Sequence, residues 1–281
     1  MGEFMIIDGK EVRDKKLEEL KVILGKINKQ LGLAVIQVGD DEASNVYIRQ
    51  KEKYALELGY RFVHKKFNSD VSEKEVLEEI DSLNKDDSIN GILVQMPLPK
   101  HLDAVKIQNK ILDTKDVDGL SFINAGKLVN DSSGLVPCTP KGIIDLLDYY
   151  KVPIEGSNCV VIGRSILVGK PIANLLLNRN GTVTICHSKT KDLDKITKKA
   201  DILIVAVGKR HFVNKDMIKR NSVIIDVGIN RYEGKLYGDV NFLDVKDKCK
   251  YITPVPGGVG PMTVIELMYN VYEAYLINCK K

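Results

Sequence analysis

The chain lacks tryptophan altogether, and only 6% of its 281 residues are aromatic. It also lacks any run approaching the roughly 18 consecutive apolar residues of a membrane-spanning helix, and its N-terminus has no signal-peptide core. The net charge of +4 comes from dispersed lysines rather than a dense basic block. A clustered basic surface is typical of nucleic-acid binding, so we expect neither nucleic acid nor a membrane as a partner.

The five cysteines lie far apart and include no C-x-x-C pair. An odd, scattered set argues against a disulfide framework and against a zinc site, and it fits a reducing compartment. We therefore expect a cytoplasmic protein that holds no metal.

Short β-branched runs alternate with amphipathic helical patterns, which predicts parallel sheet joined by crossover helices. Most of the runs are apolar throughout, so both faces of the sheet should be covered. The run RFVHKKF is mixed and predicts a more exposed strand. The expected strands are residues 32–38, 61–67, 91–96, 159–163, 182–186, 202–208 and 222–228.

Proline and glycine interrupt this alternation at residues 134–142 and 252–263. We predict two α/β domains. The first comprises residues 1–139 and is completed by a C-terminal helix, 262–281; the second, 140–261, is a Rossmann-like, doubly wound parallel sheet. Because the chain would pass between the domains more than once, we expect a hinge with an interdomain cleft.

The stretch GRSILVGK joins a predicted strand to a predicted helix, with Gly163 at its start and Gly169 near its end. Such a turn lets backbone N–H groups approach a phosphate, although the spacing is not G-x-G-x-x-G and also suits a tight turn that merely needs glycine. The next strand ends in His-Ser-Lys, residues 187–189, without the acidic residue of an NAD site. A hydroxyl, a lysine and Arg164 would attract a 2′-phosphate, which favours NADP.

Tyr47 and Lys51 lie four residues apart in a predicted helix, so their side chains share a face. Alone, this spacing favours a solvated lysine covering a half-buried tyrosine. Gln95 ends a predicted strand before MPLP and either points into a cleft or simply terminates the strand. The stretch KDVDG, residues 115–119, fails as a calcium loop and predicts a turn that directs one carboxylate at a ligand.

Eight blocks follow one another from about residue 30 to residue 270: YIRQK, GILVQMPLP, KDVDGL, PCTPKG, GRSILVGKP, CHSKT, DVGIN and TPVPGGVGPMT. Taken together, they resemble the bifunctional methylenetetrahydrofolate dehydrogenase/cyclohydrolase family. The resemblance implies that NADP⁺ oxidises 5,10-methylenetetrahydrofolate to the 5,10-methenyl cation, which is hydrolysed to 10-formyltetrahydrofolate. It also implies a homodimer acting in one-carbon metabolism and purine biosynthesis.

The resemblance assigns roles to individual residues. It implies that Lys51 is the catalytic lysine, that Gln95 positions it, and that Tyr47 stacks on the folate. Asp118 would bind the pterin. The residues implied to hold NADP are Gly163, Arg164, Ser165, Ser188 and Ile229, with Arg164 and Ser188 on the 2′-phosphate. Those implied to line the folate and nicotinamide are Pro256, Gly257, Gly258, Val259 and Gly260.

The chemistry of a methenyl cation agrees with these roles. A lysine beside a cation, removed from water, has its pKa lowered and can transfer protons near neutral pH. Gln95 can hydrogen-bond that lysine without adding a charge. The alternatives are a shikimate- or amino-acid-type dehydrogenase, which would perform no hydrolysis, and a non-catalytic NADP sensor, which should have lost Lys51 or Gln95.

Overall fold

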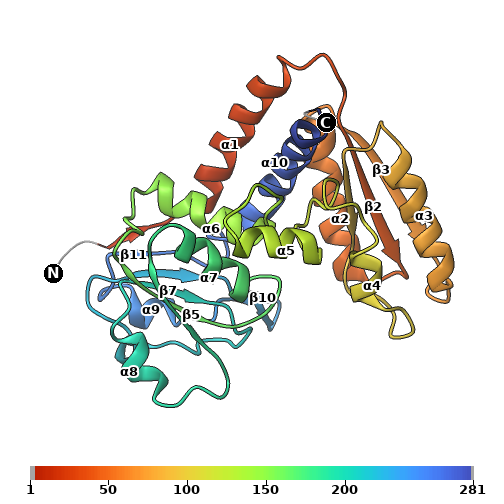
Figure 1. The fold of residues 1–281 in the computed structure, drawn as a ribbon. Helices are drawn as coiled ribbons and strands as arrows, with labels where there is room; N and C mark the ends of the chain where they lie inside the picture. Colours follow the sequence, from red (N-terminus) through yellow and green to blue (C-terminus); the bar gives the residue numbers. More distant parts are fainter. Residues whose placement is uncertain (1–3, 280–281) are drawn as a thin grey trace. The chain divides into compact units, whose positions relative to one another are not determined.

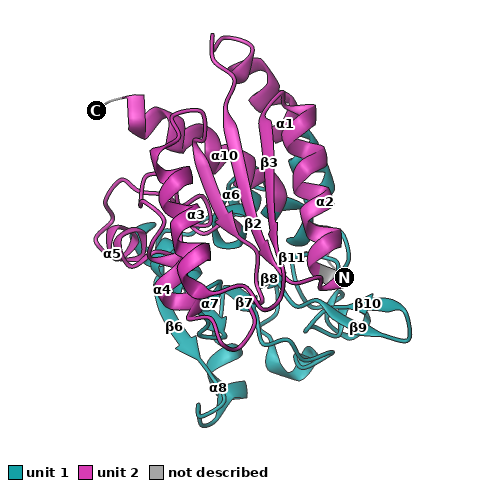
Figure 2. Ribbon diagram, turned by 90° about the vertical axis from the view of Figure 1, so that its right-hand side faces the viewer, with its two compact units in different colours: residues 1–15, 139–263 teal, residues 16–138, 264–281 magenta. Residues whose placement is uncertain are grey.

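The computed structural model describes residues 4–279, except for the side chain of Ala43, and it divides into two compact units (Figure 2). Unit 1 contains the described residues up to Lys15 and Thr139–Thr263, and unit 2 contains Lys16–Cys138 and the described residues from Val264 onward. The N-terminal residues thus differ from the prediction, which placed all of 1–139 in one domain. The reason is a short strand, Met5–Ile6, that pairs with the edge of the sheet in unit 1.

Unit 2 is built on a parallel three-stranded sheet in the order β3-β2-β4. Residues of β2 point alternately to its two faces: Ala34 and Ile36 pack with α3 and α4, whereas Gln37 hydrogen-bonds Asn45 on α2. Figure 1 shows α2 and α3 on opposite sides of β2 and β3. The elements are β2 (Gly32–Val38), α2 (Glu42–Glu57), β3 (Arg61–Phe67), α3 (Glu73–Lys85), β4 (Gly91–Val94), α4 (Ala104–Gln108) and α5 (Phe122–Val129).

Strand β3 lies at the edge of this sheet and contains only exposed and partly buried residues. Its predicted exposure is therefore confirmed. Strand β2, in the middle, is buried along its whole length.

Unit 1 contains a parallel six-stranded sheet in the order β1-β11-β8-β7-β5-β6. Numbered from β5, its five main strands run 2-1-3-4-5, the flavodoxin-like order of a doubly wound sheet. The elements are β1 (Met5–Ile6), β5 (Asn158–Ile162), α7 (Gly169–Asn178), β6 (Thr182–Cys186), α8 (Leu193–Thr197), β7 (Ile202–Val205), η1 (Lys215–Met217), β8 (Val223–Asp226), α9 (Phe242–Val245), β11 (Tyr251–Ile252) and the hairpin β9 (Asn230–Tyr232) and β10 (Lys235–Tyr237).

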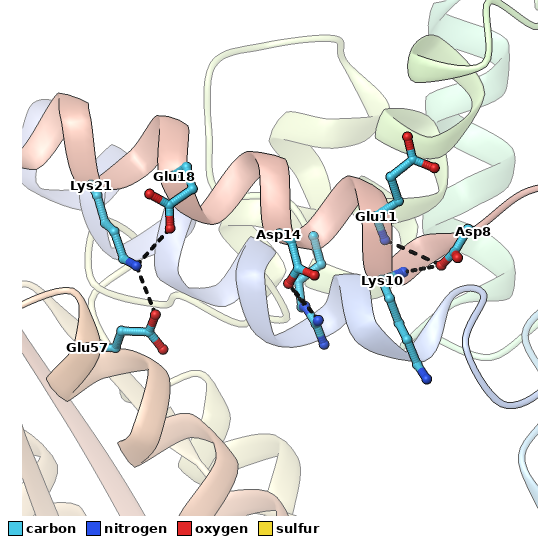
Figure 3. A network of polar contacts seen from close by, with 8 residues as sticks. Asp8, Lys10, Glu11, Asp14, Glu18, Lys21 and Glu57 are labelled. Carbon is cyan, nitrogen blue, oxygen red and sulfur yellow. Dashed lines mark hydrogen bonds and ion pairs between the residues drawn. The ribbon is translucent and has the colours of Figure 1, made fainter.

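Three helices cross a boundary between the units in sequence: α1 (Gly9–Leu24), α6 (Cys138–Tyr149) and α10 (Gly260–Cys279). Helix α1 begins at an aspartate cap, because Asp8 Oδ1 accepts from the backbone N of Lys10 at 2.8 Å and of Glu11 at 3.3 Å. Further along, Lys21 Nζ donates to Glu18 at 2.8 Å and to Glu57 on α2 at 2.9 Å (Figure 3). This second contact ties α1 to α2 within unit 2.

Three strands are shorter than predicted: β4 ends at Val94, β7 at Val205 and β8 at Asp226. In each case the last two or three residues of the predicted strand belong to the loop that follows. The loop after β7 turns at Gly208, whose φ is +64°. Within the described part of the chain, no helix is both long enough and apolar enough to cross a membrane.

We predict that Gly9→Ala destabilises the protein. A Cβ at this position would lie 1.7 Å from the Gly258 carbonyl oxygen, and the backbone N of Gly9 donates to Gly257 O at 2.9 Å. The clash should cost about 2 kcal/mol or more of unfolding free energy, measured by denaturant titration.

The matched control is Gly126→Ala in α5, where a Cβ would meet no atom within 4 Å. Alanine should stabilise that helix by about 0.5–1 kcal/mol. Equal effects of the two substitutions would contradict the close packing at Gly9.

Candidate active site

The side chain of Lys51 extends from α2 to the end of β4. Its Nζ donates to Gln95 Oε1 at 2.8 Å. Gln95 Nε2 donates in turn to the Met96 carbonyl at 2.8 Å, so the amide is held with its oxygen towards the lysine. The backbone N of Gln95 donates to Ile36 O at 2.8 Å, which fixes the residue at the end of the sheet. The lysine therefore has a hydrogen-bond acceptor that carries no charge.

Burial controls the proton affinity of this lysine. It lowers the pKa of Lys51 from the ordinary value of 10.5, whereas the neighbouring Asp118 and Cys138 raise it. Burial raises the pKa of the Asp118 carboxyl to about 6, and Lys51 acts in the opposite direction. The two groups therefore titrate closer together than a lysine and an aspartate do in water.

Tyr47 lies one turn before Lys51 on α2, and 47% of its surface is exposed. The tyrosine is thus half-buried, but the lysine is not simply solvated, because it is partly buried and its amine donates to Gln95. An exposed ring leaves its flat face available to a planar ligand.

The segment KDVDG forms the predicted turn. The backbone N of Gly119 donates to Asp116 O at 2.9 Å, and Gly119 has a φ of +67°. A Cβ there would lie 2.6 Å from the backbone of Val136, so only glycine fits. The turn places the carboxyl of Asp118 close enough to Lys51 for each group to affect the pKa of the other.

Sequence reasoning missed Cys138, which begins α6 and is buried close enough to Lys51 to affect its pKa. The residue lies in the stretch PCTPKG, where no second cysteine or histidine at a characteristic spacing marks it as functional. Unit 2 therefore brings Lys51, Gln95 and Asp118 together as expected, with one additional thiol.

The candidate ligand site of unit 1 lies where the order of its strands reverses, between β5 and β7. Doubly wound sheets bind ligands there, at the carboxyl ends of the strands. Gly163 directly follows β5 and has a φ of +135°, and a Cβ on it would lie 2.4 Å from Ala206 O in the loop after β7. The Oγ of Ser165 accepts from the backbone N of Val168 at 3.2 Å and of Gly169 at 3.3 Å, so it shapes the turn before α7.

Arg164 and Ser188 follow neighbouring strands. Because Ile162 of β5 pairs with Cys186 of β6, the two residues lie two positions beyond paired strand ends. Both are exposed, as is Lys189. This edge of the sheet thus presents two cations and a hydroxyl, the donor set that suits a phosphate.

Two buried carboxylates organise the loops at this end of unit 1. Asp239 accepts from the backbone N of Val207 at 2.7 Å, Gly208 at 2.9 Å and Lys209 at 2.8 Å, and so holds the loop after β7. Asp226 accepts from the backbone N of Gly228 at 3.0 Å, and from those of Asp239 and Val240 at 2.9 Å each. Burial raises the pKa of the Asp226 carboxyl to about 7. No local pattern indicates the role of Asp239, because the backbone groups that it binds lie about thirty residues earlier in the chain.

Ile229 and the segment 256–260 come together. Ile229 is 53% exposed after β8, and a Cβ on Gly260 would lie 4.0 Å from its Cδ1. The backbone N of Gly258 donates to Pro254 O at 2.8 Å, which forms a turn before α10. Among residues 4–279, no group of three or more His, Cys, Asp or Glu side chains could hold a metal ion.

Comparisons with known proteins identify both parts of the chain. Residues 7–118 match the family model for the tetrahydrofolate dehydrogenase/cyclohydrolase catalytic domain, and residues 137–279 match that of the NAD(P)-binding domain. A curated relative, the bifunctional protein FolD of Campylobacter hominis, is 51% identical over 273 residues, which cover 96% of each chain.

Solved structures agree with this match. The crystal structure of the bifunctional dehydrogenase/cyclohydrolase from Campylobacter jejuni superimposes with a TM-score of 0.95 at 45% identity, covering 98% of this chain and 99% of that one. The enzyme from Trypanosoma brucei, in complex with NADP and an inhibitor, gives a TM-score of 0.93 at 34% identity over all of both chains.

Proposed function

Because the chain belongs to the tetrahydrofolate dehydrogenase/cyclohydrolase family, we propose that Lys51 carries the proton transfers of two successive reactions. The protein oxidises 5,10-methylenetetrahydrofolate and hydrolyses the resulting 5,10-methenyltetrahydrofolate to 10-formyltetrahydrofolate. The observation that supports this role is the hydrogen bond from a partly buried lysine to an uncharged amide, Gln95.

In the first reaction the methylene carbon loses a hydride and becomes part of the methenyl cation. NADP⁺, when bound, accepts that hydride. The chain contributes by lowering the pKa of Lys51 through burial, since an ammonium beside the forming cation would raise the energy of the transition state. Gln95 supports this lower pKa because it hydrogen-bonds the amine without supplying a negative charge.

In the second reaction water adds to the methenyl carbon. The Lys51 amine accepts a proton from the attacking water and then delivers a proton to N5 as the carbon–N5 bond breaks. The products are 10-formyltetrahydrofolate and one released proton. A lysine of ordinary pKa would be protonated near neutral pH and could not act as the base.

Tyr47 and Asp118 would hold the folate. The exposed ring of Tyr47 would stack on the pterin, whose ring system is flat. A carboxyl with a pKa of about 6 is mostly ionised near neutral pH, so Asp118 would accept hydrogen bonds from the pterin amino group and ring N–H.

The carboxyl ends of β5, β6 and β8 would hold NADP. Arg164 and Ser188 suit its 2′-phosphate, because both are exposed beyond paired strand ends. The remaining contacts would come from Gly163, Ser165 and Ile229. The segment Pro256–Gly260, Val259 included, would line the nicotinamide and folate.

We further propose that the enzyme works as a cytoplasmic homodimer whose product supplies formyl groups for purine synthesis. The scattered cysteines and the family resemblance support this proposal. Following NADPH formation and methenyl absorbance together, with methylenetetrahydrofolate, shikimate and amino acids as substrates, tests the function. NADP⁺ reduction with shikimate alone would overturn it.

We predict that Lys51→Met abolishes the cyclohydrolase step and impairs the oxidation, because methionine cannot accept a proton. The loss should be about 10²- to 10⁴-fold or more in the rate of hydrolysis, measured as decay of methenyl absorbance. Lys53→Met, at an exposed lysine of the same helix, is the control and should retain the wild-type rate. A fully active Lys51→Met enzyme would disprove the assigned role.

We also predict that Arg164→Ala weakens NADP⁺ binding much more than NAD⁺ binding, because only NADP⁺ carries the phosphate. Losing a charge-assisted contact should cost about 1.5–3 kcal/mol with NADP⁺. Dissociation constants for both nucleotides give the comparison, with Arg220→Ala, another exposed arginine of unit 1, as the control. Equal losses for NADP⁺ and NAD⁺ would place the phosphate elsewhere.

A further inference from the structure

We propose that Lys115 is a positioning residue for the Asp118 carboxyl. Lys115 lies three residues before Asp118 in the segment KDVDG, yet its side chain binds the end of α3 rather than the site. The proposal rests on the function given above and extends it to a residue that would touch neither substrate nor cofactor.

The ammonium of Lys115 caps the C-terminus of α3. Only 7% of the residue is exposed, and its Nζ donates to the carbonyls of Leu83 at 3.1 Å, Asn84 at 2.9 Å and Asp86 at 2.9 Å. The last carbonyls of a helix have no intrahelical donors and carry a partial negative charge. Three acceptors match the three donors of an ammonium, so the side chain is fully engaged there.

Asp116 anchors the same segment on another side. Its carboxylate accepts from Gln108 Nε2 at 2.9 Å, from the backbone N of Ser121 at 2.8 Å and from Asn124 Nδ2 at 3.0 Å. The residue is completely buried. A buried carboxylate with three donors holds its backbone in place, because moving it would leave a charge without partners.

The backbone between these anchors is also fixed. The N of Ile92 donates to Lys115 O at 2.8 Å, which adds the segment to the edge of β4. Val117 packs over Gly91, where a Cβ would lie 2.5 Å from Val117 Cγ1, and its carbonyl accepts from Asn270 Nδ2 at 2.8 Å. The residues before Asp118 are thus immobilised, and its carboxyl is presented from a rigid backbone.

This rigidity matters because Asp118 and Lys51 influence each other's charge. If the segment moves, the carboxyl leaves the amine and the pterin together. The amine would then lose the carboxylate that favours its protonated form, and the folate would lose an acceptor. A purely structural role for Lys115 predicts neither change.

The experiment compares Lys115→Met with Lys110→Met. Lys110 belongs to the same connection and also binds α3, since its Nζ lies 2.7 Å from Asp81, but that ion pair is partly exposed. We expect Lys115→Met to lower the cyclohydrolase kcat roughly 10- to 100-fold, to raise the folate KM, and to move the Lys51 limb of the pH–rate profile to lower pH. Lys110→Met should leave all three unchanged.

Gln108→Leu provides a second variant in case Lys115→Met fails to fold. It removes one donor to Asp116, and within the described chain Gln108 Oε1 is a buried atom without a hydrogen-bond partner, so little else is lost. We expect a smaller change of the same sign. Folded variants with an unaltered pH–rate profile and KM would overturn the positioning role, whereas an inactive wild-type enzyme would overturn the proposed function instead.

Discussion

The hydrogen bond between Lys51 and Gln95 is the interaction on which the chemistry of this protein depends. A buried lysine beside a carboxylate alone would form an ion pair and stay protonated. An amide partner satisfies the amine without that charge, and the Met96 carbonyl and the backbone of Ile36 keep the amide in place. Burial outweighs the opposing effect of the nearby Asp118 carboxyl, so the amine holds its proton less tightly than an ordinary lysine does.

Both units position their sites with buried carboxylates that bind backbone N–H groups or side-chain amides. Asp116 does this for the segment carrying Asp118, and Asp239 and Asp226 do it for the loops after β7 and β8. Such residues fix the loops at the strand ends, where ligands bind in sheets of this kind. The loops are consequently rigid although they contain several glycines, which allow close backbone approach.

Local patterns predicted much of this structure. The spacing of Tyr47 and Lys51 identified their common helix, and the apolar runs identified the parallel strands, because both depend on neighbouring residues. The placement of the N-terminal residues was wrong, since Met5 and Ile6 pair with β11 at the other end of the chain. The sequence indicates only that Lys115 belongs to a turn. The carbonyls that its side chain caps lie about thirty residues earlier, and no sequence pattern connects them with it.

The central claim is that Lys51 holds a proton less tightly than an ordinary lysine. NMR titration of ¹⁵N-labelled lysine side chains in the folded enzyme measures this directly, with the Lys51 signal identified by its absence in Lys51→Met. Our account predicts a deprotonation midpoint below 10.5, the ordinary value. A midpoint at or above 10.5 would contradict the account, because it would show that burial does not weaken the hold of the amine on its proton.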